Sequence, residues 1–572
     1  MVRIDPDNLE VHRIEIGALP VVNAVLARLG FDELVAAYLP EPDLRCRISS
    51  AEAIGILVRN LALSRRPLYG LSAWAADYDA ALLGLCDGEA RLLNDDKVGR
   101  ALDELFSSDR ASLLTSLSLS AIRRFHICVN ELHNDSTSIT LYGTYRQATG
   151  TPRAGVRPPV PERGFSKDHR GDLLQLVEIL TVSADGAVPI AHRLVDGSVE
   201  DSTTHICTWD QLVAMLQTAT FTYVADSKLC TRDNLDHIAH HGGRFLTILP
   251  KTRKEDGIGR AWIAGGDVFW EEIARRPGKR RDDPDRVYWA AEASTPSAEG
   301  YRIVWIRSSE KRSHDGAVRT DRIERARAGL CALSDKLASP RCQLRSRAAV
   351  EEAAARVVAE AGAATWVKVE VSDVVEVEHR QETRGRPGKN TRYRRIERHC
   401  FSLTVTIDAE AVAYDAASDG CFPFITNEAL APAELLRIYK AQPHLERRHA
   451  TFKGVIEAAP LTLKSDARID ALAFCLYVAL LVHALVEREL RQAMAAKSIT
   501  ALPLYHENRA CAAPTAARVF ELLEPLGSTV VLHAGKRLTV VPPTLDPLQR
   551  QLLSLLKVPS SAYLPSRRAS AK

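Results

Sequence analysis

The order of apolar segments after residue 124 is the feature that most constrains the fold. Residues 125–132, "FHICVNEL", alternate in the manner of a strand. The next two apolar segments, 173–182 and 188–195, flank Asp185-Gly186, a pair that suits the turn of a hairpin. The chain therefore enters this region with three strands, the last two of which are predicted to pair antiparallel.

Helices and strands then alternate. A helical pattern over 203–219 precedes a short apolar strand at 221–226, and a helix at 232–241, capped by Thr231, precedes a strand at 244–250. This order predicts the α/β class, with a mixed sheet and helices on its faces. It is similar to the layout of an RNase H-like domain.

The rest of the chain divides by pattern. Mostly helical periodicity, with Ser50 placed to cap one helix, predicts an all-α N-terminal domain. After residue 250 the strand series stops and resumes at "CFPFIT", residues 421–426, so the intervening α+β segment is expected to be a large insertion. The expected parts are 1–122 (helical domain), 123–250 and 421–500 (two pieces of the α/β domain), 251–420 (insertion), and 501–572 (C-terminal helical segment and tail).

The net charge does not indicate a partner, whereas the cysteine pattern and the apolar segments favour a cytoplasmic location. Lys and Arg number 75 against 72 Asp and Glu, so the total charge of +3 does not indicate a nucleic-acid partner. The 11 cysteines form no CxxC pair, as expected for reduced thiols in a cytoplasmic protein. No signal-peptide pattern opens the sequence, and the apolar run 471–485 is too short for a membrane span, so we expect a buried helix there and no membrane association.

One local segment is strongly basic. Residues 378–399 contain eight Arg or Lys and three Glu, a net charge of +5. Within it, "RGRP" at 384–387 resembles the core of an AT-hook, a minor-groove element, which makes Arg384 and Arg386 candidates for DNA binding. A solvated loop is an equally good interpretation of this segment.

Two carboxylates follow apolar segments that are predicted to be strands. Asp135 comes just after the first strand, and Asp226 ends the strand at 221–226. If the first and fourth strands are neighbours, the two side chains converge at one edge of the sheet. Each Asp alone is also typical of a strand end that begins a turn. Glu446 is a candidate third carboxylate, which would complete an all-oxygen set suited to Mg²⁺ or Mn²⁺.

Glu446 lies in the segment 439–453, "YKAQPHLERRHATFK". At 100° per residue, a single helix would place Tyr439, Gln442, Glu446 and Lys453 on one face. Pro443 lies among them and is expected to kink this helix, because it removes one backbone hydrogen bond.

The spacing of these residues resembles the Tyr-Arg-Glu-Lys signature of DDE-type insertion-sequence transposases, with Gln442 in place of the Arg. "NDSTSI" around Asp135 and "YVADSKL" around Asp226 resemble the two Asp motifs of the same enzymes. The long segment between Asp226 and Glu446 is similar to their β-rich insertion. The resemblance extends over nearly the whole chain.

The resemblance implies an enzyme that cleaves transposon ends and transfers the strands into target DNA. Asp135, Asp226 and Glu446 would be catalytic and would bind two Mg²⁺ ions, for which Mn²⁺ can substitute. Tyr439, Gln442 and Lys453 would contact DNA, although Gln442 lacks the charge of the arginine. Expected partners are double-stranded DNA, as terminal inverted repeats and as target, and further copies of the chain, with a role for the N-terminal domain in binding the DNA end.

Two alternatives remain at this point. An RNase H-like DNA nuclease would cut without joining strands. A DNA-binding protein derived from a transposase would have lost activity, although the presence of all three acids argues against it.

Overall fold

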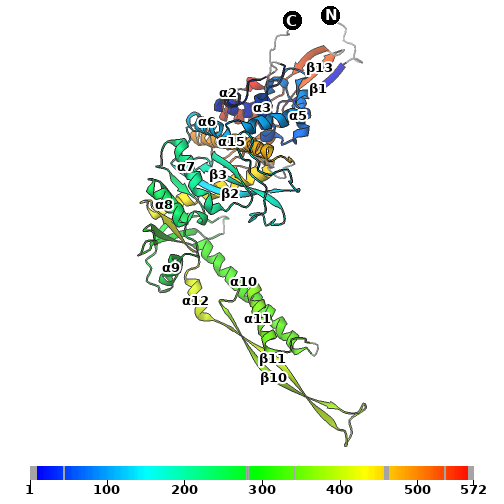
Figure 1. The fold of residues 1–572 in the computed structure, drawn as a ribbon, viewed down its shortest axis with the longest axis vertical. Coiled ribbons are helices and arrows are strands. Elements are labelled where there is room, and N and C mark those ends of the chain that lie inside the picture. The colour runs from blue at the N-terminus through cyan, green and yellow to red at the C-terminus, as the bar shows by residue number, and fades with distance from the viewer. Residues whose placement is uncertain are drawn as a thin grey trace. The chain divides into compact units, whose positions relative to one another are not determined.

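The computed structural model describes residues 9–42, 45–278, 280, 283–339, 342–455, 463–533 and 536–564. The chain forms two compact units. Unit 1 comprises Met1–Thr247 together with Arg437–Lys572, and unit 2 is Ile248–Leu436. The strands β10 and β11 and the helices α10 to α12 of unit 2 can be followed in green and yellow-green in Figure 1.

The mixed α/β fold expected from the sequence is confirmed. In unit 1 the strand order is β4-β3-β2-β5-β6. β2 pairs antiparallel with β3 and β3 with β4, whereas β2 pairs parallel with β5 and β5 with β6. The first and fourth strands of this series are therefore neighbours, as predicted. The strands are β2 (Glu131–Leu141), β3 (Leu174–Ser183), β4 (Pro189–Val195), β5 (Thr222–Val224) and β6 (Arg244–Ile248).

Local sequence signals explain the elements between these strands. The β3–β4 turn has positive φ at Gly186 (82°) and Ala187 (52°), as a tight hairpin requires. Helix α7 (His205–Leu216) lies between β4 and β5 in the chain. Helix α8 (Arg232–His240) lies between β5 and β6 and begins where the Thr231 hydroxyl accepts a hydrogen bond from the Asn234 N–H at 3.3 Å.

The first strand begins later than the sequence suggested. Helix α6 (Arg110–Phe125) continues to Phe125, and His126 ends it with a left-handed φ of 53°. Strand β2 then begins at Glu131 rather than at residue 125, so Asp135 lies within the strand and not just after it. The alternation in "FHICVNEL" misled because it covers a helix end and a short loop.

The N-terminal region is mostly helical, as expected, but it begins with a strand. β1 (Leu9–Glu15) pairs antiparallel with β13 (Gly527–His533), which also pairs with β14 (Lys536–Val541). Ser49, not Ser50, caps α3, in a capping box with Glu52. The other helices before α6 are α1 (Leu19–Leu29), α2 (Phe31–Tyr38), α3 (Ser50–Leu63), α4 (Leu71–Asp77) and α5 (Asp95–Ser107).

Helix α15 (Asp466–Ala496) is the core helix of unit 1. It packs against α3, α5 and α1, so the N-terminal helices and the C-terminal region share one compact unit instead of forming separate domains. Among the described residues it is the one helix long and apolar enough to cross a membrane, and its most apolar 18-residue window is 94% buried inside the protein. The sequence prediction of a buried helix is thus confirmed. Helices α16 (Ala516–Leu523) and α17 (Pro547–Leu555) follow.

Unit 2 contains its own strands, in the order β12-β9-β8-β7. β12 pairs antiparallel with β9, so "CFPFIT" joins the strands of the expected insertion. The unit ends at Leu436, beyond the expected boundary at residue 420. Its elements are α9 (Lys254–Ala264), β7 (Glu271–Arg276), β8 (Arg286–Glu292), β9 (Arg302–Ser308), α10 (Ser309–Ala338), α11 (Arg347–Glu360), β10 (Val367–Gln381), β11 (Tyr393–Ile407), α12 (Ala409–Ala417) and β12 (Cys421–Thr426).

A buried ion pair ties three parts of unit 1 together. Arg448, in α14 (Gln442–Ala450), lies 2.8 Å from Glu487 of α15, and both side chains are less than 10% exposed. Arg448 also donates to the carbonyl oxygens of Ala187 (2.8 Å) and Gly186 (2.9 Å) in the β3–β4 turn. The Glu487 carboxylate accepts from the Ala516 N–H at 3.1 Å.

We expect Glu487→Ala to destabilise unit 1 by about 3–5 kcal/mol, because it leaves a buried guanidinium unpaired. The measurement is the shift in the denaturant midpoint of unit 1. Glu521→Ala is the control, since Glu521 is 60% exposed and pairs with Arg518, and its loss should cost at most about 1 kcal/mol. Equal shifts for the two variants would contradict this role for Glu487.

Candidate active site

Asp135 lies within β2, and Asp226 follows β5, the parallel neighbour of β2. The register pairs Glu131 with Thr222 and His133 with Val224, so Asp135 and Asp226 each come two residues after the last pair. Neighbouring strands are about 4.8 Å apart, and equal displacement along a parallel pair puts both side chains on the same face. Asp226 directly follows β5, and its carboxylate accepts a hydrogen bond from the Lys228 N–H at 2.9 Å.

The electrostatics of Asp226 reflect this proximity. Burial raises the pKa of the Asp226 carboxyl, and the negative charges of Asp135 and Asp201 raise it further. The Lys228 N–H and the Lys167 ammonium act in the opposite direction but do not cancel the rise. A second positive charge near Asp226 would therefore favour its ionised form.

Lys167 is the cation at the centre of this group. Its ammonium lies 3.2 Å from Asp135 and 3.2 Å from Asp201, and it donates to the Ser136 carbonyl oxygen at 2.6 Å. Burial by itself would lower the pKa of Lys167, but the two aspartates raise it above its ordinary value. The sequence prediction missed Lys167 and Asp201, because both lie in polar segments outside any motif.

The pKa of Tyr439 is influenced by all three predicted carboxylates. Burial raises the pKa of the Tyr439 phenol, and the charges of Asp226, Glu446 and Asp135 raise it further, in that order. One phenol therefore lies within the field of all three predicted acids. Glu446 itself is exposed, whereas Asp135 and Asp226 are half-buried.

The sequence pattern predicted one kinked helix for the segment that carries Tyr439 and Glu446. The structure has two helices there. α13 (Pro432–Tyr439) ends at Tyr439, and α14 begins at Gln442. Pro443 lies in the first turn of α14, where its missing N–H costs no helical hydrogen bond. The shared face inferred from a single helix therefore does not extend back to Tyr439.

Gln442 is buried, in contrast to its expected place on a DNA-facing surface. Its amide oxygen lies 2.9 Å from His133 Nδ1, and its amide nitrogen donates to the Asn134 carbonyl oxygen at 3.2 Å. Both partners belong to β2. The side chain thus holds the start of α14 on the strand that carries Asp135, which makes it a positioning residue.

Lys453 also differs from the expected arrangement. It lies in a π-helical turn, Thr451–Val455, which interrupts the helical spacing after α14. Its ammonium is 2.9 Å from both carboxylate oxygens of Asp168. The Lys453 side chain is 24% exposed, so it pairs with Asp168 at the protein surface.

Three buried or half-buried side chains, His449, Glu178 and His192, form a chain of contacts that begins at Asp135. His449 Nε2 is 3.8 Å from Asp135, and His449 Nδ1 is 3.8 Å from Glu178, which is fully buried. His192 lies 4.0 Å from the other oxygen of Glu178, and burial lowers the pKa of its imidazole. Neither oxygen of Glu178 accepts a hydrogen bond within the described part of the chain.

The donor chemistry of the three acids fits a hard cation, because all their ligand atoms are oxygens. Among the described residues, however, no group of three or more His, Cys, Asp or Glu side chains is close enough to hold a metal ion. Lys167 instead provides the positive charge next to Asp135. Metal binding by these acids would therefore require Lys167 and Glu446 to shift.

The two predicted arginines of the basic segment lie elsewhere. Arg384 and Arg386 are exposed in the loop that joins β10 and β11 of unit 2. They belong to unit 2, whereas Asp135, Asp226 and Glu446 belong to unit 1.

Comparison with known proteins gives one partial match. The profile of a family described as a domain of unknown function, DUF4277, matches residues 10–119. The match covers β1, α1 to α5 and part of α6, and so excludes all three acids. No curated protein matches the chain.

Proposed function

We propose that this protein is a DNA transposase of the DDE type, which cleaves DNA at transposon ends and transfers the strands into target DNA. The observation that supports the proposal most is the placement of Asp135 on β2 and of Asp226 directly after the parallel neighbour β5, with Glu446 on the later helix α14. They come from two neighbouring strands and a following helix, in the chain order of the Asp, Asp and Glu motifs.

Asp135, Asp226 and Glu446 are the residues that would hold Mg²⁺ or Mn²⁺. Two ions bound there would activate a water or a 3′-hydroxyl and stabilise the leaving oxygen of an in-line phosphoryl displacement. Lys167 neutralises Asp135 and Asp201 in the absence of metal and so reduces the repulsion between neighbouring carboxylates. The Tyr439 phenol, which is protonated at neutral pH, would act as a hydrogen-bond donor near the reacting phosphate.

Lys453 belongs to the phosphate-binding side of the proposed site. It is a partly exposed cation seven residues after Glu446, and its pairing with Asp168 at the surface can be exchanged for a phosphate contact. The substrates are double-stranded DNA, as terminal inverted repeats and as target. Two ends must be brought together, so we propose a homo-oligomer on DNA, in the cytoplasm.

The alternatives differ in what they do with a DNA end. A nuclease on the same α/β fold would cleave but not join strands. An inactive derivative would bind DNA only. Because all three acids are present and the Lys167 ammonium lies 3.2 Å from Asp135, we favour the active enzyme.

Each of Asp135→Ala, Asp226→Ala and Glu446→Gln should reduce cleavage of a terminal-repeat duplex by at least about 10³-fold, since each removes a ligand of the catalytic ions. Binding of the same duplex, measured by anisotropy, should change little. The control is Asp210→Asn. Asp210 is an exposed acid on α7 that pairs with His237, and this variant should cleave at the wild-type rate. Cleavage at the wild-type rate by one of the three variants would remove that residue from the site.

Lys167→Met should strengthen Mn²⁺ binding to the DNA-free protein several-fold, because an ammonium 3.2 Å from Asp135 repels a metal cation. Titration calorimetry gives the affinity without relying on activity. Lys254→Met, which changes the charge equally but at an exposed position in unit 2, is the control. Unchanged or weaker Mn²⁺ binding by Lys167→Met would show that Lys167 does not compete with metal.

A further inference from the structure

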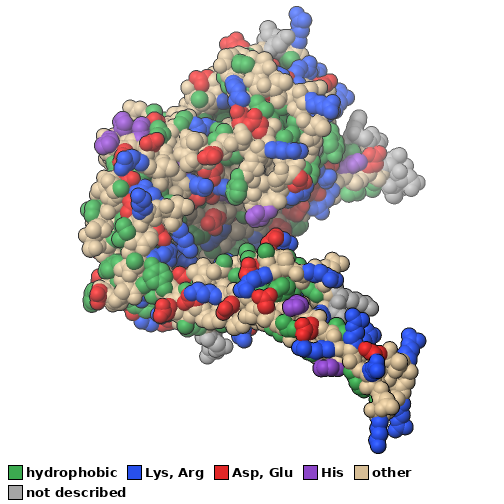
Figure 2. All heavy atoms as spheres, turned by 60° about the horizontal axis from the view of Figure 1, so that its bottom comes forward, with side chains coloured by type: hydrophobic (Ala, Val, Ile, Leu, Met, Phe, Trp, Pro, Cys, Tyr) green, Lys and Arg blue, Asp and Glu red, His purple; other side chains and the backbone are tan. Residues whose placement is uncertain are grey.

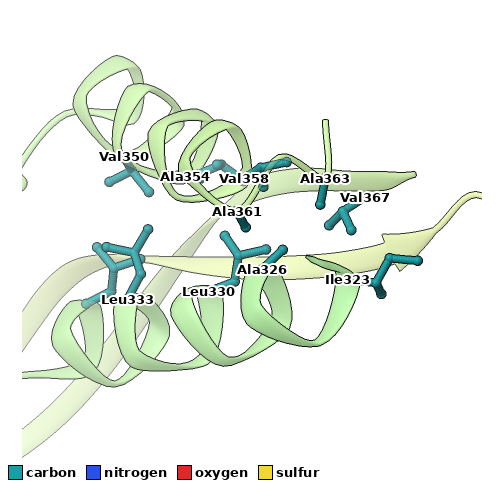
Figure 3. Packing of buried hydrophobic residues seen from close by; sticks show 12 residues of the cluster. Ile323, Ala326, Leu330, Leu333, Val350, Ala354, Val358, Ala361, Ala363 and Val367 are labelled. Carbon is teal, nitrogen blue, oxygen red and sulfur yellow. The ribbon is translucent and has the colours of Figure 1, made fainter. Parts of the chain in front are cut away.

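The strands β10 and β11 form a long two-stranded ribbon with a packed root. They pair from Val367–Ile407 to Gln381–Tyr393, 15 residues on each strand, which at about 3.4 Å per residue gives a length of about 50 Å. At the root, Val367 and Val371 join a hydrophobic cluster with α10 and α11. Figure 3 shows the helices α10 and α11 facing each other through this cluster, with Leu330 and Val358 among the contacts.

The distal part of the ribbon has no such support. The cluster reaches Val371 on β10 and Phe401 on β11, and residues 373–380 of β10 are exposed on both faces. An isolated hairpin is marginally stable in water, so the root anchors a segment that would not persist alone. A free ribbon with two exposed faces is suited to contact a partner.

Charge is distributed unequally along this ribbon. Residues 370–378 contain four acids and no Lys or Arg. Residues 380–395, at the distal end, contain seven Arg or Lys and one Glu, a net charge of +6. In Figure 2 the blue side chains gather at the free end of this ribbon. This charge suits the distal end to a polyanionic partner.

Most of these cations have no counter-charge in the protein. Within the described part of the chain, six of the seven form no ion pair, and all six are exposed. Arg380 lies directly opposite Arg394 in the register, an arrangement that destabilises a ribbon unless an anion is bound. The six are Arg380, Arg384, Arg386, Lys389, Arg392 and Arg394.

We propose that this ribbon is an arm that binds duplex DNA, with its loop in the minor groove. Arg384 and Arg386 are separated by Gly385, whose φ of 142° and open surroundings let the backbone approach a groove floor closely. Pro387 lies in the middle of the loop, and proteins that bind the minor groove combine arginines with such apolar side chains. The paired Arg380 and Arg394 then contact phosphates along the groove.

This binding goes beyond the proposed catalysis, because it uses none of the three acids and needs no metal. The full-length protein is titrated in EDTA against two 30-base-pair duplexes, one with an A·T tract and one with a G·C run. For Arg384→Ala/Arg386→Ala the slope of log K against log salt should flatten by about 2, affinity should fall by at least about tenfold, and the preference for A·T should disappear.

The matched control is Arg325→Ala/Arg356→Ala, which removes the same charge from exposed arginines on α10 and α11 that pair with acids of their own helices. It should bind like the wild type. An unchanged salt slope for the loop variant, or an equal loss of DNA affinity in both variants, would contradict DNA binding by this arm. Because no cleavage occurs in EDTA, either result is independent of whether the three acids are catalytic.

Discussion

The parallel pairing of β2 with β5 is the constraint on which the candidate site depends. It places Asp135 on the strand next to the one that Asp226 follows, and the pKa of Asp226 is raised first by burial and then by the negative charges of Asp135 and Asp201. Lys167 reduces the repulsion between the carboxylates, because its ammonium lies between Asp135 and Asp201.

The third acid depends on how α14 is held. Gln442 fixes the start of the helix to β2, and Arg448 fixes its last turn to the β3–β4 turn and to α15. Glu446 lies between these two anchors and is exposed. The buried contacts of Gln442 and Arg448 thus fix the position of the helix that carries this exposed acid.

Much of this arrangement was predictable from the sequence, and the exceptions have physical causes. The order of strands and helices along the chain follows from periodicity, whereas the adjacency of the strands that carry or precede Asp135 and Asp226 rested on the similarity to an RNase H-like layout. The single-helix interpretation was wrong because Pro443 begins a helix instead of kinking one. Lys167 and His449 were missed because their roles depend on contacts with residues far along the chain, such as Asp201 and Glu178, which no local pattern reveals.

The central claim is that the three acids join DNA strands, and a strand-transfer assay tests it most directly. The protein is given a pre-cleaved terminal-repeat end, a supercoiled target plasmid and Mg²⁺, and joined products are separated on a gel. If the protein is a transposase, we expect joined product with the wild-type protein and none when Mg²⁺ is replaced by EDTA. Cleavage of an intact end without any joining of a pre-cleaved one would contradict it, and would leave a nuclease in its place.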